Sequence, residues 1–205
     1  MAADPRPARS VVSSDQHLEE TRVEGARVFD GALLDVRRDV VRLPDGATTI
    51  REYIVHPGAV LIIPVLADGR FVVERQFRYP LHRVFLEFPA GKLDAGESAL
   101  VTAQRELTEE TGYIAARWTR LGLIHPTVSY STEAIEIFVA GDLTHVGRKL
   151  DDGEFLDIAE MTSDALLAAL DDGELTDAKT VAALLMYLRK HQNRSAPPLG
   201  AEGRA

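Results

Sequence analysis

Three glutamates, Glu106, Glu109 and Glu110, fall within five residues of a segment that is predicted to be helical. Residues 98–111 contain no glycine or proline and are rich in strong helix formers, and Gly112 ends the run. With about 100° between successive residues of an α-helix, Glu110 lies about 40° to one side of Glu106 and Glu109 about 60° to the other. The sequence therefore predicts a helix on which three carboxylates share one narrow arc.

This acidic arc borders the apolar stripe of the same helix. Leu100, Ala103 and Leu107 fall roughly 60° to 120° from Glu106 around the helix axis. Like charges this close repel one another unless cations neutralise them, and carboxylate oxygens are preferred ligands of Mg²⁺ and Mn²⁺. The helix alone also allows a plainer interpretation, in which its carboxylates form a solvated face.

The overall composition limits the ligands that such a helix can serve. The chain has 205 residues, a formal net charge of −9 and no cysteine. A negative charge argues against a nucleic-acid partner, which requires a basic surface, and the lack of cysteine excludes thiol nucleophiles, thiolate metal sites and disulfides. A phosphate-bearing substrate stays compatible, because metal ions held by carboxylates supply the missing positive charge.

Neither a membrane span nor an export signal is expected. The longest apolar run, residues 59–67, is about nine residues long and contains Pro64, whereas a spanning helix needs about 20 residues. The first ten residues carry charges and prolines where a signal peptide has its apolar stretch. We therefore expect a cytoplasmic protein without a membrane partner.

The chain is predicted to consist of two tails, a small sheet and a main domain. Residues 1–16 and 193–205 are rich in proline, alanine, serine, glycine and charge, which predicts disordered tails. Residues 17–57 predict an antiparallel sheet of about three strands. Residues 58–192 form the main domain.

The main domain mixes strands and helices. Strands are expected at residues 59–66, 71–77, 84–88, 121–125 and 134–140. Helices are expected at residues 98–111, 163–170 and 176–191. This order predicts an α/β (α+β) fold, a mixed sheet with helices on both sides.

The segment around the acidic helix resembles a known motif. The Nudix box, G-x5-E-x7-R-E-U-x-E-E-x-G-U with U an apolar residue, is matched by Gly91, Glu97, Arg105, Glu106, Leu107, Glu109, Glu110, Gly112 and Tyr113. Only the last position departs mildly, with an aromatic residue. The chain thus resembles a Nudix hydrolase, which implies an α/β/α sandwich and metal-dependent hydrolysis of a nucleoside diphosphate linked to another group.

The resemblance also implies roles for the residues of the box. Glu106 and Glu110 are expected to bind Mg²⁺ directly, with Mn²⁺ as a possible substitute, Glu109 directly or through water, and the Ala90 carbonyl to complete the site. Four further positions are expected to be structural, a bracing ion pair and two glycines: Glu97, Arg105, Gly91 and Gly112.

Three segments outside the box resemble the ADP-ribose pyrophosphatase branch of this family: L-E-F-P-A-G around Glu87, R-E-Y-I-V-H-P-G-A-V from Arg51, and Q-F-R ending at Arg78. The resemblance implies substrate binding by Glu87, by Arg78 near the phosphates, and by Arg51 and Glu52 across a dimer interface. The residues also allow plainer roles, a salt bridge from Glu87 to a nearby arginine and an exposed strand pair at residues 51–52.

The loop from His125 to Glu133, H-P-T-V-S-Y-S-T-E, resembles the segment in which a glutamate of that branch closes over the metals. Glu133 is therefore the candidate general base or additional metal ligand, although it also fits a solvated residue at a strand start. Glu109 and Glu87 are the alternatives for the base. Glu109 and Glu110 are also expected to be catalytic, because they hold the metal.

Taken together, the resemblance implies a homodimeric, Mg²⁺-dependent enzyme that cleaves ADP-ribose to AMP and ribose 5-phosphate. One alternative is hydrolysis of another nucleoside diphosphate sugar, such as an ADP-hexose or GDP-mannose, because the box does not distinguish base or sugar. A second is a non-catalytic ADP-ribose sensor. Such a sensor loses the box carboxylates, and all of them are present here.

Overall fold

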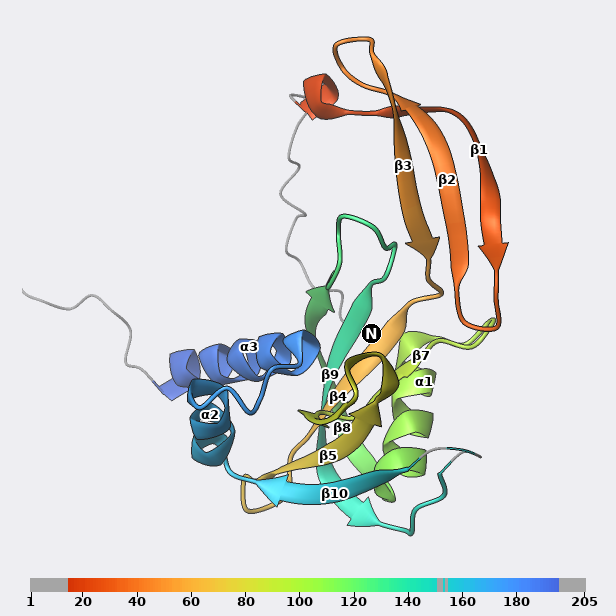
Figure 1. The fold of residues 1–205 in the computed structure, drawn as a ribbon. Coiled ribbons are helices and arrows are strands. Elements are labelled where there is room, and N and C mark those ends of the chain that lie inside the picture. Colours follow the sequence, from red (N-terminus) through yellow and green to blue (C-terminus); the bar gives the residue numbers. More distant parts are fainter. Residues whose placement is uncertain (1–14, 151–152, 154, 196–205) are drawn as a thin grey trace, which may run out of the picture. The chain divides into compact units, whose positions relative to one another are not determined.

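The structure is a computed structural model that describes residues 15–150, 153 and 155–195 (Figure 1). It separates into two compact units, one from Met1–His56 with Ser129–Thr132, the other from Pro57–Val128 with Glu133–Ala205. The division thus falls one residue before the predicted one, and part of a later loop joins the N-terminal unit. The predicted tails lie mostly outside the described residues.

The N-terminal unit is an antiparallel sheet in the order β1-β2-β3, preceded by a 3-10 turn, η1 (Asp15–Leu18). Its strands are β1 (Thr21–Asp30), β2 (Asp35–Arg42) and β3 (Thr48–Val55). Directly opposed residues share a face, so the pairs Phe29–Val36, Val36–Ile54 and Val40–Ile50 define one apolar face. Phe29 is 55% and Ile50 45% exposed.

The main unit contains two sheets (Figure 1). The four-stranded sheet has the order β7-β4-β9-β8, from β7 (Ala90–Lys92), β4 (Ala59–Pro64), β9 (Ile135–His145) and β8 (Tyr113–Ile124). The three-stranded sheet has the order β10-β5-β6, from β10 (Leu156–Met161), β5 (Phe71–Arg78) and β6 (Arg83–Glu87), with η2 (Tyr79–Leu81) between the last two. Since β4 pairs with β9 in parallel and with β7 antiparallel, the sheet is mixed as predicted.

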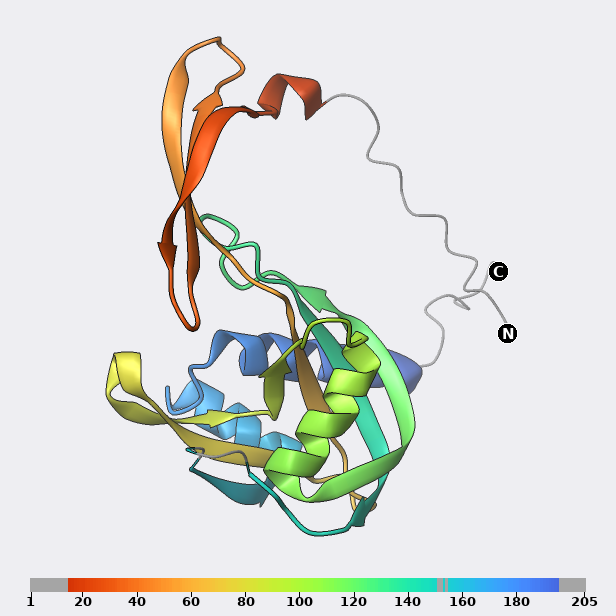
Figure 2. The same ribbon diagram turned by 90° about the vertical axis from the view of Figure 1, so that its right-hand side faces the viewer.

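Helices cover both sides of the four-stranded sheet (Figure 2). They are α1 (Ala99–Glu106), which continues as the π turn η3 (Leu107–Thr111), α2 (Ser163–Asp171) and α3 (Ala178–Ser195). The central strand β4 is buried along its whole length: Leu61 and Ile63 pack in the core beneath α2 and α3, and Val60 and Ile62 in the core beneath α1. The predicted sandwich is therefore confirmed.

The structure corrects several predicted boundaries. The last helix reaches Ser195, so residues 193–195 are helical rather than part of a tail. The strands β7 and β10 and the first two thirds of β8 were not predicted. β7 is only three residues long and β10 pairs with the distant β5, so neither gives a strong local signal. Within the described residues, no helix is long and apolar enough to cross a membrane.

Candidate active site

Two glutamates of the acidic helix lie against β7. The backbone amide of Ala90 donates a hydrogen bond of 3.1 Å to the Glu110 carboxylate, and Glu110 is only 3% exposed. A Cβ atom on Gly91 would overlap the Glu106 carboxylate. Glycine at this position therefore lets Glu106 approach the strand, and the two carboxylates lie beside consecutive residues of β7.

Arg105 neutralises the acidic helix from within. Its Nη1 lies 3.0 Å from Glu106 Oε1 and 2.9 Å from Glu109 Oε2, and its Nη2 lies 3.3 Å from Glu97 Oε2. Burial lowers the pKa of this guanidinium, but the hydrogen bond to Glu97 and the charges of Glu106 and Glu109 outweigh burial and raise it. Arg105 therefore stays cationic, and the predicted brace between Glu97 and Arg105 has the required geometry.

The ends of the helix are fixed by local chemistry. Ser98 caps the first turn by accepting a 3.4 Å hydrogen bond from the Val101 amide. The helix then changes to a π turn at residues 107–111, which alters the angular spacing of Glu109 and Glu110 from that of a regular helix. Gly112 ends the turn at φ 74°, where a Cβ atom would lie 2.8 Å from the Arg148 nitrogen.

The carboxylates offer donors for a hard cation. Glu106 and Glu110 present carboxylate oxygens beside the Ala90–Gly91 backbone, a donor set that suits Mg²⁺ or Mn²⁺. Glu109, like Glu106, pairs with Arg105. Among residues 15–150, 153 and 155–195, no three histidine, aspartate or glutamate side chains gather into a metal-binding group. Of the predicted ligand set, the structure thus brings Glu106 and Glu110 together beside Ala90.

Glu87 is buried between two cations at the end of β6. Arg78 donates from Nε and Nη2 to the two oxygens of Glu87, both at 2.7 Å, and Lys179 Nζ donates to the same carboxylate. Burial raises the pKa of Glu87, but Arg78 and Lys179 together outweigh it and lower the pKa. With 1% exposure and both oxygens engaged, Glu87 fits the plainer salt-bridge role. Its roles as substrate ligand or general base stay predictions.

The partners that fix Glu87 from the helix side were missed in the sequence. Lys179 also contacts Asp177 Oδ2 at 2.9 Å, and Asp177 accepts hydrogen bonds from the backbone amide and the hydroxyl of Thr180. The Thr180 hydroxyl in turn accepts a bond of 3.0 Å from the Phe88 amide. In the sequence, the run Asp177 to Thr180 indicates a helix start and resembles the ADP-ribose pyrophosphatase branch, but its contact with Glu87 is not predicted.

A cavity of about 280 Å³ opens beside this network, lined by Arg78, Pro80, Leu81, Phe85, Glu87, Asp177 and Lys179. The side chain of Arg78 is 40% exposed, whereas that of Glu87 is 2% exposed. The cavity therefore presents the guanidinium of Arg78, fixed from behind by Glu87, to a ligand. An oriented guanidinium suits a phosphate, which it binds with two parallel hydrogen bonds.

Arg51 and Glu52 lie in the N-terminal unit and have partners there. Arg51 contacts Glu20 through Nη2 at 2.5 Å, and Glu52 lies 3.7 Å from Arg38. As neighbours on β3 they point to opposite faces, with Glu52 on the apolar face. Their geometry is that of an exposed strand pair, and their role at the substrate stays a prediction.

Glu133 precedes β9. Measured along the strand direction, it lies several residues away from the point where Ala90 meets the box carboxylates. Along the sheet, Ile137 pairs with Leu61, which pairs with Ala90. Glu133 is four residues before Ile137, roughly 13 Å at strand spacing. The side chain is half-buried. Its predicted role as base therefore rests on the resemblance alone.

Comparison with known proteins identifies relatives over most of the chain. Residues 55–184 match the NUDIX domain, and residues 20–54 match the nucleoside diphosphate sugar hydrolase N-terminal domain. An ADP-ribose pyrophosphatase of Bacillus subtilis is 37% identical, covering 84% of this chain and 94% of that protein. A methanol dehydrogenase activator of Bacillus methanolicus is also 37% identical, over 83% and 93%.

A solved structure supports the same relationship. The crystal structure of an ADP compounds hydrolase superposes with a TM-score of 0.78 at 26% identity. The alignment covers 86% of this chain and 97% of that one. The similarity thus extends beyond the box to both units.

Proposed function

Because the chain belongs to the Nudix hydrolase family, we propose that this pyrophosphohydrolase cleaves the diphosphate of ADP-ribose to AMP and ribose 5-phosphate. The observation that carries the reaction class is the placement of Glu106 and Glu110 against β7, with Arg105 beside them. The name of the B. subtilis relative supports ADP-ribose as the substrate. A cytoplasmic location is part of the proposal, and the cysteine-free sequence is compatible with it.

Mg²⁺ is the proposed cofactor, with Mn²⁺ as a substitute. Glu106, Glu110 and the Ala90 carbonyl would hold it, with Glu109 as a further ligand directly or through water. A metal held by these residues would supply charge neutralisation on the diphosphate and a more acidic attacking water. Arg105 remains next to Glu106 and Glu109 and keeps these carboxylates from repelling one another.

Arg78 is the proposed ligand of the diphosphate from the side of the cavity. Its guanidinium is held by two hydrogen bonds to Glu87 and cannot rotate freely. This orientation lowers the entropy lost when a phosphate binds. Glu87 and Lys179 act through Arg78 and are positioning residues.

Glu133 is the proposed base that orients or deprotonates the attacking water, and Glu109 is the alternative. Glu109 lies on the same turn as Glu110 but pairs with Arg105, which opposes a role as proton acceptor. Comparison of Glu133→Gln and Glu109→Gln by pH–rate profile separates the two. The variant that loses the acidic limb of the profile identifies the base.

We further propose a homodimer in which the apolar face of the N-terminal sheet contacts a second copy of the chain. A three-stranded sheet alone is marginally stable and must bury an apolar face. Within its own unit, no described element covers Phe29 or Ile50. Glu52 lies on this face and Arg51 on the other, and both are proposed to reach the substrate across the dimer.

A second substrate class has support from the comparisons. The N-terminal match is named for nucleoside diphosphate sugar hydrolases, and the solved relative for ADP compounds. An ADP-hexose or GDP-mannose is therefore the alternative substrate. The intact carboxylates of the box oppose the non-catalytic sensor.

The test is hydrolysis by the purified chain with Mg²⁺. ADP-ribose, ADP-glucose and GDP-mannose are compared by kcat/KM, and AMP release is followed by chromatography. The proposal requires ADP-ribose to have the highest kcat/KM. Absence of AMP release from ADP-ribose rejects the proposal, and a higher kcat/KM for another sugar supports the alternative.

A further inference from the structure

Thr180, in the first turn of α3, is fully buried and its hydroxyl forms two hydrogen bonds. Oγ1 donates to Asp177 Oδ2 at 2.6 Å and accepts from the Phe88 backbone amide at 3.0 Å. The bond to Asp177 belongs to the cap of the helix, because the Thr180 amide donates to the same oxygen at 3.0 Å. The bond from Phe88 has no part in capping. It joins α3 to a segment 92 residues earlier in the chain.

The connection from β6 to the start of β7 offers only two backbone donors, because Pro89 has no N–H. The Ala90 amide donates to the Glu110 carboxylate at 3.1 Å, and the Phe88 amide donates to Thr180. Phe88 is fully buried, and a buried amide that loses its acceptor is costly. The connection is therefore held by the box helix at one amide and by α3 at the other.

The carbonyl of Ala90 faces the box helix. The preceding carbonyl, that of Pro89, accepts a 2.9 Å hydrogen bond from the Ile62 amide and so faces β4. Successive carbonyls of an extended chain point to opposite edges, and the amide and carbonyl of one strand residue share an edge. Because the Ala90 amide donates to Glu110, the Ala90 carbonyl lies on the same edge as that carboxylate. Its exact position depends on how the connection is held.

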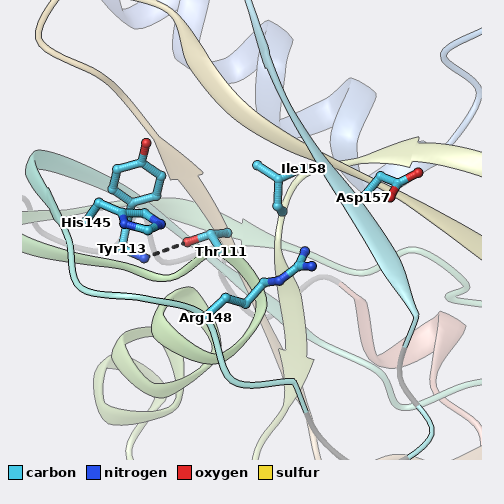
Figure 3. A pocket seen from close by; sticks show the side chains of 6 residues that line it. All are labelled: Thr111, Tyr113, His145, Arg148, Asp157 and Ile158. Carbon is cyan, nitrogen blue, oxygen red and sulfur yellow. Dashed lines mark hydrogen bonds between the residues drawn. The ribbon is translucent and has the colours of Figure 1, made fainter.

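The helix side of the site is held within the box itself (Figure 3). The buried Thr111 hydroxyl donates to the Leu107 carbonyl and accepts a 3.2 Å hydrogen bond from the Tyr113 amide. Figure 3 shows Thr111 and Tyr113 joined in this way at the edge of a cavity of about 430 Å³. The turn that carries Glu110 thus has bonds of its own, whereas the connection that carries Ala90 is held by Thr180.

From these contacts we propose that Thr180 is a positioning residue of the metal site. By fixing the Phe88 amide, it sets the position of the Ala90 carbonyl relative to Glu106 and Glu110, and so raises the affinity of the site for the cation. Residues that hold a metal ligand in place typically change metal affinity about 10- to 100-fold. The inference rests on the proposed metal site, and it does not depend on which sugar the substrate carries.

The test is titration of the full chain with Mn²⁺ in the absence of substrate, with free Mn²⁺ followed by electron paramagnetic resonance. Thr180→Val keeps the shape of the side chain but removes the hydroxyl, and is expected to weaken Mn²⁺ binding about tenfold. Thr180→Ser keeps the hydroxyl and should restore most of the affinity. Thr180→Ala, which leaves room for a water molecule, replaces Thr180→Val if that variant does not fold, and should also weaken Mn²⁺ binding.

Thr162→Val is the matched control. The Thr162 hydroxyl also accepts a hydrogen bond from a backbone amide, that of Ala165 at 3.1 Å, but it caps α2, on the opposite side of the four-stranded sheet from α1. Its Mn²⁺ affinity should equal that of the wild type. Urea denaturation of every variant separates a general loss of stability from a loss of Mn²⁺ affinity.

The positioning role and the proposed function can fail separately. Wild-type hydrolysis of ADP-ribose, together with unchanged Mn²⁺ affinity in a folded variant without the Thr180 hydroxyl, overturns the positioning role and leaves the proposed function intact. Equal weakening in Thr162→Val also overturns the positioning role. If the wild type does not hydrolyse ADP-ribose but Thr180→Val still weakens Mn²⁺ binding, the positioning role stands and the substrate assignment is wrong. A wild type that binds no Mn²⁺ overturns the metal site and the positioning role alike.

Discussion

Arg78 and Glu87 form a fork-to-fork pair in which both guanidinium-to-carboxylate distances are 2.7 Å. The pair joins neighbouring strands, β5 and β6, and only its arginine reaches the surface. Lys179 on α3 also contacts the Glu87 carboxylate, so this one carboxylate is shared by two cations. In this arrangement Glu87 supports Arg78.

Replacement of Glu87 is expected to destabilise the protein strongly. Glu87→Gln removes the negative charge that compensates Arg78 and Lys179. Loss of one partner of a buried pair costs about 3 to 5 kcal/mol, and we expect the lower end because Arg78 is 40% exposed and Lys179 keeps Asp177. Urea denaturation measures the change in free energy of unfolding. Glu174→Gln, at an exposed position, is the control and should stay within about 0.5 kcal/mol of the wild type.

Lys179 is expected to affect substrate binding without touching the substrate. Lys179→Met loosens Glu87 and with it the orientation of Arg78, so we expect a rise of KM on the order of tenfold with a smaller change in kcat. Lys179→Arg keeps the cation and should restore most of the affinity. Steady-state kinetics on ADP-ribose measure both constants. An equal fall of kcat in both variants, with KM unchanged, contradicts the positioning role.

Acid is expected to destabilise the protein partly through Glu87. The folded protein holds the pKa of Glu87 below its usual value of 4.5. This lowered pKa contributes stability that is fully present above pH 4.5 and is lost as the pH falls toward the folded-state pKa. Urea denaturation between pH 7 and pH 3 should show the loss. A smaller pH dependence of the unfolding free energy in Glu87→Gln identifies this carboxylate as a source.

The box carboxylates are expected to be needed for activity and not for folding. Glu106→Gln and Glu110→Gln each remove a proposed metal ligand and should lower kcat at least about 10²-fold, because even outer-shell partners of a metal cost 10- to 100-fold. EDTA should abolish wild-type turnover and Mg²⁺ restore it. Thermal melting provides the control for folding. Full activity in EDTA, or in Glu110→Gln, contradicts the metal-dependent reaction.

The box and the core could be predicted from sequence because their signals are local. The spacing of Glu106 and Glu110, and the glycine that lets Glu106 approach β7, lie within one short segment of strand, loop and helix. The network around Glu87 could not be predicted, since Lys179 is 92 residues away and meets it only through the packing of α3. The π turn also escaped prediction, because its hydrogen-bond pattern depends on tertiary packing rather than on helix propensity.

A charge placed on the apolar face of the N-terminal sheet should disrupt the proposed dimer. Ile50 and Ile114 are matched strand residues, 45% and 46% exposed, but only Ile50 lies on the apolar face of the N-terminal sheet. Ile50→Asp buries an unpaired carboxylate in the proposed interface and should shift the protein toward the monomer, whereas Ile114→Asp should remain dimeric. Light scattering coupled to size-exclusion chromatography, over a range of concentrations, measures the mass. A wild-type chain that is monomeric at all concentrations, or two variants that dissociate alike, contradicts the proposed interface.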